Sequence, residues 1–192
     1  AVDGDRIVAM SALDLASRGE LTNNVVVATV MANLGFHRFL HEHGIDVIAA
    51  PVGDKFVAEA MADSGAVLGG EQSGHIIFAA HSTTGDGVLT GLKVARLVAT
   101  VGQPLSRLAH AYESFPQVLI NVPVKDRGSL DAAEDIWELV NSVEARLGED
   151  GRVLLRPSGT EPLVRVMVEA TTEQTATDAA GVIADAVRSR LG

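Results

Sequence analysis

Apolar residues follow two alternating patterns in the first half of the chain. Short, largely apolar runs at Val25–Thr29 and Asp46–Ala50 predict buried strands. Residues 33–43 and 54–64 instead carry apolar residues at a helical period and predict helices. One face of the second helix is expected to carry Phe56, Val57, Ala60 and Met61. This alternation predicts a parallel or mixed sheet with helices on both faces.

Residues that start and stop helices agree with this pattern. Asp54 is placed to cap the second helix, and Gly65 to end it. Short strands are expected at 67–68 and 75–78, on either side of a glycine-rich turn, and Asp86 is placed to cap a further helix. We therefore expect an α/β fold for this part of the chain.

The pattern changes near residue 110. Gln117–Val124 alternates apolar and polar residues, which predicts a half-buried strand. An apolar stripe predicts a helix over residues 129–147, capped by Ser129. Two further strands, Arg152–Arg156 and Leu163–Ala170, flank a polar bend.

The last helix and the division into domains follow from the same pattern. Thr171 and Gln174 have the spacing of a capping box and predict the start of a helix. The second part therefore has the order β-α-β-β-α, a small α+β domain in which two helices cover an antiparallel sheet. We expect domains at 1–107 and 115–192, with the boundary between about 104 and 115.

The charge of the chain restricts its partners. The 192 residues carry a formal net charge of −10, which argues against nucleic acid or an anionic membrane surface as a partner. An anionic ligand would need a local basic pocket. The chain has no cysteine, which fits a reducing cytoplasm.

Targeting signals are not expected in this sequence. No apolar run reaches the roughly 18 residues of a membrane span, and the first residues do not resemble a signal peptide. The chain begins with alanine, directly in sequence that is typical of an ordered protein. We expect it to be part of a longer protein.

The bend Arg156–Pro162 brings several hydrogen-bond donors together. Arg156 offers a planar guanidinium that matches phosphate, and Arg165 follows on the next strand. Ser158 and Thr160 each offer a hydroxyl and a backbone N–H, and Gly159 lets a ligand approach the backbone closely. The residues predict a phosphate site or, alternatively, an ordinary polar hairpin turn.

A second candidate lies in the glycine-rich stretch 69–75. If this segment is extended, Glu71, Ser73 and His75 point to the same side. A carboxylate and a hydroxyl suit sugar hydroxyls, and an imidazole can also move a proton near neutral pH. The alternative is a glycine-rich turn between strands.

Two places suggest a metal site at first sight. Asp3 and Asp5 lie in a short Asp/Gly-rich segment, but two carboxylates at this spacing form no cage for a hard metal ion, and capping of a helix is the better interpretation. His37 and His41 are one helical turn apart, a spacing that can bind zinc, but no third ligand is evident. We expect no metal site in this chain.

Five stretches, in order, resemble the phosphohexomutase family. They are residues 29–35 (TVMANLG), 52–56 (VGDKF), 69–77 (GGEQSGHII), 83–87 (TTGDG) and 156–169 (RPSGTEPLVRVMVE). The resemblance covers essentially the whole chain and is closest to the hexosamine-phosphate branch. It implies the last two of four domains, with a phosphoserine and a Mg²⁺ loop in the two domains that are missing here.

The resemblance also implies a mechanism. Family enzymes move a phosphoryl group between O1 and O6 of a hexose through the phosphoserine and a bisphosphate, here a hexosamine 1,6-bisphosphate. The bound ligand turns around between the two transfers. Arg156, Ser158, Gly159, Thr160 and Arg165 would hold the phosphate that is not reacting.

The glycine-rich stretch would handle the sugar. The resemblance implies that Glu71 and Ser73 bind ring hydroxyls and that His75 is a catalytic acid or base. Lys55 would stabilise the transferring phosphate, although its position also fits a surface lysine. A histidine and a lysine would thus be the catalytic residues of this part of the protein.

Partners follow from the same resemblance. They are a hexosamine phosphate substrate, the two missing domains and, through exposed apolar surface, a second copy in a homodimer. Glucose or mannose phosphates stay open as substrates, because no residue visibly recognises a 2-amino group. We expect the chain alone to be inactive as a mutase; the alternative is an independent sugar-phosphate-binding module.

Overall fold

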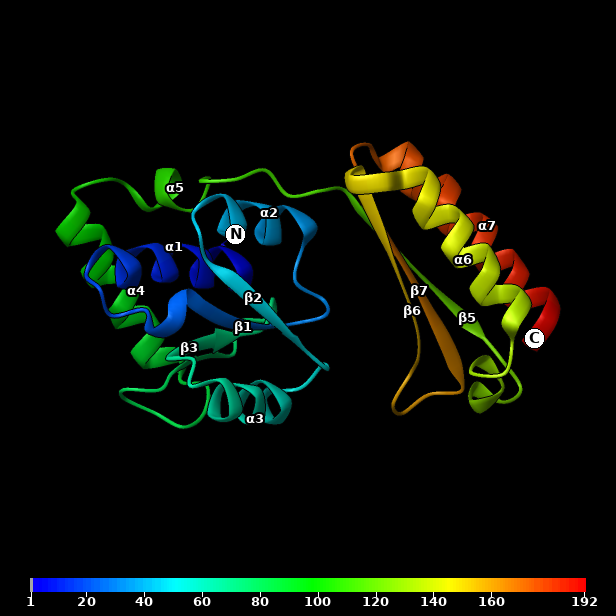
Figure 1. The fold of residues 1–192 in the computed structure, drawn as a ribbon, viewed down its shortest axis with the longest axis horizontal. Helices are drawn as coiled ribbons and strands as arrows, with labels where there is room; N and C mark the ends of the chain where they lie inside the picture. Colours follow the sequence, from blue (N-terminus) through cyan, green and yellow to red (C-terminus); the bar gives the residue numbers. More distant parts are fainter. Residues whose placement is uncertain (1) are drawn as a thin grey trace. The chain divides into compact units, whose positions relative to one another are not determined.

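The protein consists of two compact units that meet between Ser114 and Phe115. The structure is a computed structural model, and it describes residues 2–192. The first unit contains α1 (Gly4–Ser17), β1 (Val25–Thr29), α2 (Leu34–Glu42), β2 (Asp46–Ala50), α3 (Asp54–Ser64), β3 (Leu68–Gly70), β4 (Ile76–Phe78), α4 (Gly87–Val101) and α5 (Leu105–Leu108). The second contains β5 (Gln117–Pro123), α6 (Glu134–Leu147), β6 (Gly151–Pro157), β7 (Leu163–Ala170) and α7 (Glu173–Leu191). Figure 1 shows both units.

The first unit is built on a mixed sheet with the strand order β2-β1-β3-β4. Strand β1 runs parallel to β2 and to β3, whereas β3 and β4 form an antiparallel pair. Because the chain passes from β1 to β2 on one side and then returns to β3 on the other, the order reverses at β1. The predicted α/β fold is confirmed.

Helices cover both faces of this sheet (Figure 1). Val26 and Ala28 of β1 pack with α1 and α2, and the alternate residues Val25 and Val27 pack with α3 on the opposite face. Every residue of β1 is buried, as the continuous apolar run predicts for the central strand of such a sheet.

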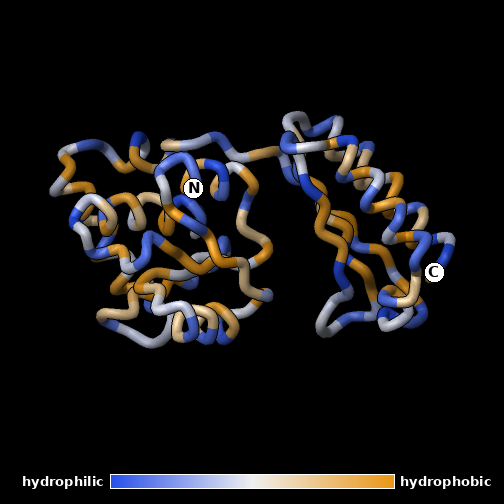
Figure 2. The backbone as a smooth tube through the Cα atoms, viewed as in Figure 1, coloured by the Kyte–Doolittle hydropathy of each residue, from blue (hydrophilic) through white to orange (hydrophobic). Residues whose placement is uncertain are grey.

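The second unit is a three-stranded antiparallel sheet with the order β5-β7-β6. Val164, Val166 and Val168 of β7 point into a core with α6 and α7, and the alternate residues of β7 lie on the other face. In Figure 2 the strands of this sheet are strongly hydrophobic, whereas the bend between β6 and β7 is not. The small α+β domain predicted from the sequence is confirmed.

Several helix starts differ from the sequence prediction. Helix α6 begins at Glu134, because Ser129 belongs to a short 3₁₀ turn that Asp126 caps. Thr172 rather than Thr171 caps α7. In each case neighbouring polar residues could cap the helix, and a spacing rule alone does not decide which of them does.

Helix α3 shows a related difference. Its cap is Gly53, and Asp54 is the first helical residue, where its carboxylate accepts a hydrogen bond from Lys55 N (2.8 Å). Val57 and Met61 are buried as predicted, but Phe56 is 41% exposed. The predicted apolar face of α3 is therefore wrong at Phe56.

The first unit extends past residue 107 because Arg6 holds the segment that follows. Its guanidinium donates to the backbone oxygens of Ala109 and Tyr112 and to Ser114 Oγ. It also lies 5.0 Å from the centre of the Tyr112 ring. Burial of this tyrosine raises its pKa above the usual value.

No helix within residues 2–192 is long and apolar enough to span a membrane.

The core predicts how two phenylalanines differ. Phe36 is fully buried between α1 and the sheet, so Phe36→Ala is expected to lower the free energy of unfolding by about 3–5 kcal/mol. Phe56→Ala, at an exposed position, should change it by less than about 1 kcal/mol. Chemical denaturation of the two variants measures this, and equal losses would contradict the packing described here.

Candidate functional site

Three loops of the first unit meet at one edge of its sheet. The strands β1, β2 and β3 are parallel, so the segments that follow them, at 30–33, 51–53 and 71–75, leave the sheet at the same edge. In open α/β sheets ligands bind outside the carboxyl ends of the strands, at the point where the strand order reverses. The stretch 69–75, singled out in the sequence, therefore lies where a ligand is expected.

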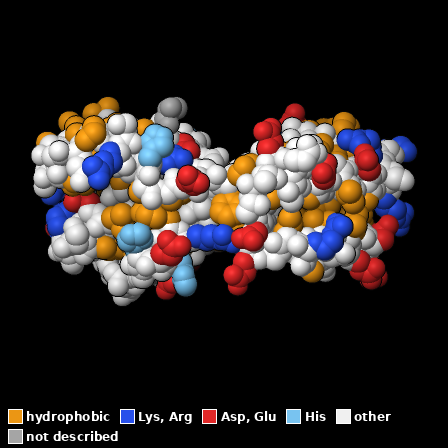
Figure 3. Space-filling view, turned by 90° about the horizontal axis from the view of Figure 1, so that it is seen from above, with side chains coloured by type: hydrophobic (Ala, Val, Ile, Leu, Met, Phe, Trp, Pro, Cys, Tyr) orange, Lys and Arg blue, Asp and Glu red, His pale blue; other side chains and the backbone are white. Residues whose placement is uncertain are grey.

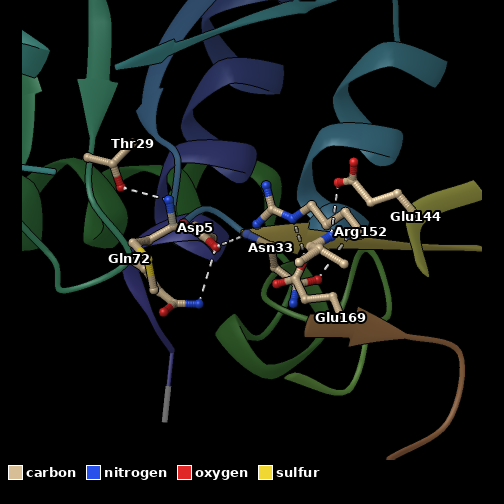
Figure 4. Close-up of polar contacts among 10 residues, drawn as sticks. Asp5, Thr29, Asn33, Gln72, Glu144, Arg152 and Glu169 are labelled. Carbon is tan, nitrogen blue, oxygen red and sulfur yellow. Dashed lines mark hydrogen bonds and ion pairs between the residues drawn. The ribbon is translucent and has the colours of Figure 1, made fainter. Parts of the chain in front are cut away.

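The start of α1 fixes two of these loops. Asp5 is buried, and its Oδ2 accepts hydrogen bonds from Asn33 N (2.9 Å) and Gln72 Nε2 (3.5 Å; Figure 4). Gly4 N donates to Gln72 O at 2.9 Å. A Cβ at Gly4 would lie 1.9 Å from Glu71 O, so only glycine allows this approach. The sequence prediction missed this role of Asp5 because its partners are distant in the chain.

The Asp/Gly-rich segment is a helix start, as the sequence indicated. Asp3 caps α1 and accepts a hydrogen bond from Arg6 N at 3.0 Å. Among residues 2–192 no group of three His, Cys, Asp or Glu side chains is placed to hold a metal ion, and this includes the histidines of α2.

Residues 71–75 form a turn rather than the extended segment that the sequence argument assumed, and this turn brings Glu71, Ser73 and His75 close together. His75 Nδ1 lies 3.3 Å from Ser73 Oγ and 3.7 Å from Glu71 Oε2. The His75 side chain is 63% exposed and that of Glu71 only 13%. The other carboxylate oxygen, Oε1, accepts a hydrogen bond from Gly53 N at 3.0 Å. The turn thus presents an accessible imidazole above a nearly buried carboxylate.

Lys55 is connected to this turn through the backbone of its loop. It follows Gly53, which Glu71 holds, and lies in the first turn of α3. Its side chain is 75% exposed and lies 3.7 Å from Glu59. The ammonium group is therefore accessible to a ligand, but its geometry also fits a surface lysine.

The bend of the second unit is tightly organised. Ser158 is buried, its N–H donates to Leu163 O (2.9 Å), and its Oγ accepts a hydrogen bond from Glu161 N (3.3 Å). Thr160 and Gly159 are exposed at the tip. A Cβ at Gly159 would have no heavy atom within 4 Å, so nothing in the chain requires glycine there.

The two arginines beside the bend form an unfavourable pair. Arg156 and Arg165 are direct cross-strand partners on the face of the sheet that does not carry α6 and α7. Like charges at such positions repel each other. Burial of the guanidinium, and then the charge of Arg165, lower the pKa of Arg156 below its usual value. Arg165 Nη2 reaches Glu161 at 3.3 Å, but its Nε is buried with no hydrogen-bond partner in the described residues.

A second cross-strand pair, on the same face and the same two strands, has opposite charges. Arg152 and Glu169 are also direct cross-strand partners, and their side chains form an ion pair of 2.7 Å (Figure 4). Their charges are complementary, whereas those of Arg156 and Arg165 are not. An anion between the two arginines would remove this repulsion.

The sequence prediction missed a third arginine at the bend. Arg127 Nη1 donates to Ser158 O at 2.7 Å, from a 3₁₀ turn that precedes α6. Asp126 holds this turn; the backbone N–H of Gly128, and then the hydroxyl of Ser129, lower the pKa of its carboxyl group. No spacing rule connects Arg127 with a bend so distant in sequence. On the face drawn in Figure 3, basic side chains are interspersed with acidic ones and form no extended basic surface.

Two family models match the chain. Residues 3–115 match the α/β/α domain III of the phosphoglucomutase/phosphomannomutase family, and residues 119–186 match its C-terminal domain. The chain is 56% identical over 190 residues to the phosphoglucosamine mutase of Frankia alni and 47% identical over 191 residues to that of Bacillus licheniformis. These matches cover 99% and 100% of the chain but only 42% and 43% of the relatives, so the chain spans less than half of their length.

Solved structures have the same fold. N-acetylphosphoglucosamine mutase of Aspergillus fumigatus matches with a TM-score of 0.85 and 24% identity, over 98% of this chain and 43% of that one. Another structure of that enzyme, in complex with GlcNAc-6P and magnesium, matches with a TM-score of 0.83 and 24% identity, over 98% of this chain and 44% of that one. At this identity the likeness shows the fold alone.

The two cross-strand pairs predict different effects on stability. Arg165→Gln removes the repulsion by Arg156 together with the exposed 3.3 Å ion pair with Glu161, so it is expected to change the free energy of unfolding by less than about 1 kcal/mol. Arg152→Gln removes the 2.7 Å ion pair of the fully buried Glu169 and should lower it by about 1.5–3 kcal/mol. Urea denaturation in a phosphate-free buffer measures both; equal losses in the two variants would contradict this difference.

Proposed function

The chain belongs to the phosphoglucomutase/phosphomannomutase family, and we propose that it forms the third and C-terminal domains of a phosphoglucosamine mutase. The complete enzyme would interconvert glucosamine 6-phosphate and glucosamine 1-phosphate through a phosphoserine and a hexosamine 1,6-bisphosphate. The identity of about half the residues with phosphoglucosamine mutases supports this substrate over glucose and mannose phosphates.

The unfavourable pair of Arg156 and Arg165 is the observation that supports a phosphate ligand most strongly. Two guanidinium groups on directly paired residues of neighbouring strands suit a dianion. Ser158, Gly159 and Thr160 add backbone N–H groups and hydroxyls at the adjoining tip. The bend binds the phosphate that does not react, and this binding energy positions the other end of the sugar for transfer.

The turn 71–75 binds the sugar in this proposal. Glu71 and Ser73 accept and donate hydrogen bonds to ring hydroxyls, and His75 moves a proton at the reacting oxygen. Lys55 stabilises negative charge on the transferring phosphate. A mutase binds its ligand in two orientations. Carboxylate and hydroxyl groups suit this requirement, because they can form hydrogen bonds with the ring hydroxyls in either orientation.

Magnesium and the phosphoserine belong to other parts of the proposed enzyme. No group of three side chains is placed to hold a metal ion in the described part of this chain, and we assign the Mg²⁺ ligands to the other parts of the proposed enzyme. The role of this chain is to bind and orient the ligand and to move protons. We also expect the proposed enzyme to be cytoplasmic and to form a homodimer.

A chimera tests the proposed function. The chain is fused behind the N-terminal part of the Frankia alni enzyme in place of the matched 42% of that protein, and kcat and KM are measured for glucosamine 6-phosphate. We expect activity in the chimera and none in the isolated chain. Gly159→Ala should raise KM about tenfold, because the new methyl group moves the phosphate away from a backbone N–H.

Gly91→Ala in α4 is the matched control. A Cβ there also has no heavy atom within 4 Å, and its KM should equal that of the parent chimera. A folded but inactive chimera, judged by circular dichroism, would contradict the proposal. Greater efficiency with glucose or mannose 6-phosphate would favour those substrates instead.

A further inference from the structure

Only one nitrogen of the His75 ring makes contacts with its own turn. Nδ1 lies 3.3 Å from Ser73 Oγ and 3.7 Å from Glu71 Oε2. No such contact is recorded for Nε2 among the described residues, and the side chain is 63% exposed. The two nitrogens therefore have different environments, so the two tautomers of the neutral ring differ in free energy.

Glu71 decides which nitrogen carries the proton. A serine hydroxyl can donate or accept, so Ser73 is compatible with either tautomer. Glu71 Oε2, at 3.7 Å from Nδ1, is too far for a hydrogen bond, but the negative charge of an ionised carboxylate at this distance favours a proton on Nδ1. The carboxylate is only 13% exposed, which limits the screening of this interaction by water.

Backbone groups hold the Glu71 carboxylate and pack against the Cβ of His75. Gly53 N donates to Glu71 Oε1, which leaves Oε2 on the side of His75. On the other side, a Cβ at Gly85 would lie 3.3 Å from His75 Cβ, so the turn that contains Gly85 packs closely against the histidine. Glu71 N also donates to His75 O at 3.0 Å, which closes the turn.

We propose that Glu71 is a positioning residue that fixes neutral His75 in the tautomer with its proton on Nδ1. Nε2 then carries the lone pair and is the nitrogen that accepts a proton from a ligand hydroxyl. The positive charge that forms on the ring faces the Glu71 carboxylate, which stabilises it. This role adds to the sugar contact of Glu71, and its catalytic meaning rests on the proposed function.

Nuclear magnetic resonance tests the tautomer directly in the 192-residue chain. Protonated and unprotonated imidazole nitrogens have distinct ¹⁵N shifts, which long-range ¹H–¹⁵N spectra at about pH 8.5 resolve, about two units above the ordinary pKa of histidine. The chain has six histidines, and the spectrum of His75→Gln identifies the signal of His75. We expect the Nδ1–H form, although the Nε2–H form predominates in unstructured peptides.

Glu71→Gln should reverse the tautomer. The amide oxygen can still accept the hydrogen bond of Gly53 N, and the amide NH₂ that replaces Oε2 brings a donor instead of a negative charge to the side of Nδ1, which favours an unprotonated Nδ1. Ser73→Ala is the matched control and should keep the Nδ1–H form. A backbone ¹H–¹⁵N spectrum that is unchanged outside residues 71–75 shows that each variant is folded.

Two results would overturn the proposal. They are a predominant Nε2–H form in the wild-type chain, and an Nδ1–H form that is retained in folded Glu71→Gln. The wild-type measurement needs no variant, so it remains decisive if Glu71→Gln fails to fold. Because no substrate is present, the result is independent of whether the chimera is an active mutase.

Discussion

The pairing of Arg156 with Arg165 is the constraint on which the proposed phosphate site of the second unit depends. Two strands place these arginines opposite each other, four residues along from the pair Arg152 and Glu169, whose charges are complementary. The fold can therefore build a cross-strand ion pair on this face but has like charges beside the bend. Such a departure from local consistency is typical of binding sites, where stability is given up for affinity.

The first unit follows a different rule, because its candidate groups lie on loops rather than on strands. The parallel strands bring these loops to one edge of the sheet, and two carboxylates then fix them. Asp5 connects the start of α1 with the loops after β1 and β3, and Glu71 connects the turn 71–75 with Gly53. Loops that carry the candidate groups are thus connected by hydrogen bonds to two carboxylates, an arrangement that would preorganise them for a ligand.

The sequence predicted the strands of both units and the order of the helices well, because apolar periodicity and glycine stops act locally. Glu71, Ser73 and His75 do lie close together, as the sequence indicated, but a turn closed by the hydrogen bond from Glu71 N to His75 O brings them together and not the alternation of an extended segment. The sequence prediction failed where the outcome depends on distant partners. The exposure of Phe56 and the contact of Arg127 with the bend are examples, because packing and distant hydrogen bonds decide them. The cap of α6 was missed for another reason, the competition between neighbouring polar residues.

The most direct test of the account is calorimetric titration of the 192-residue chain with inorganic phosphate, comparing the wild type with Arg156→Ala and Arg188→Ala. Arg188 is an exposed arginine of α7 and controls for the loss of one positive charge. The account predicts that Arg156→Ala weakens binding about 10- to 100-fold, the loss of a charge-assisted hydrogen bond, and that Arg188→Ala binds like the wild type. Equal weakening in both variants, or no binding by the wild-type chain, would contradict a preformed phosphate site at the bend.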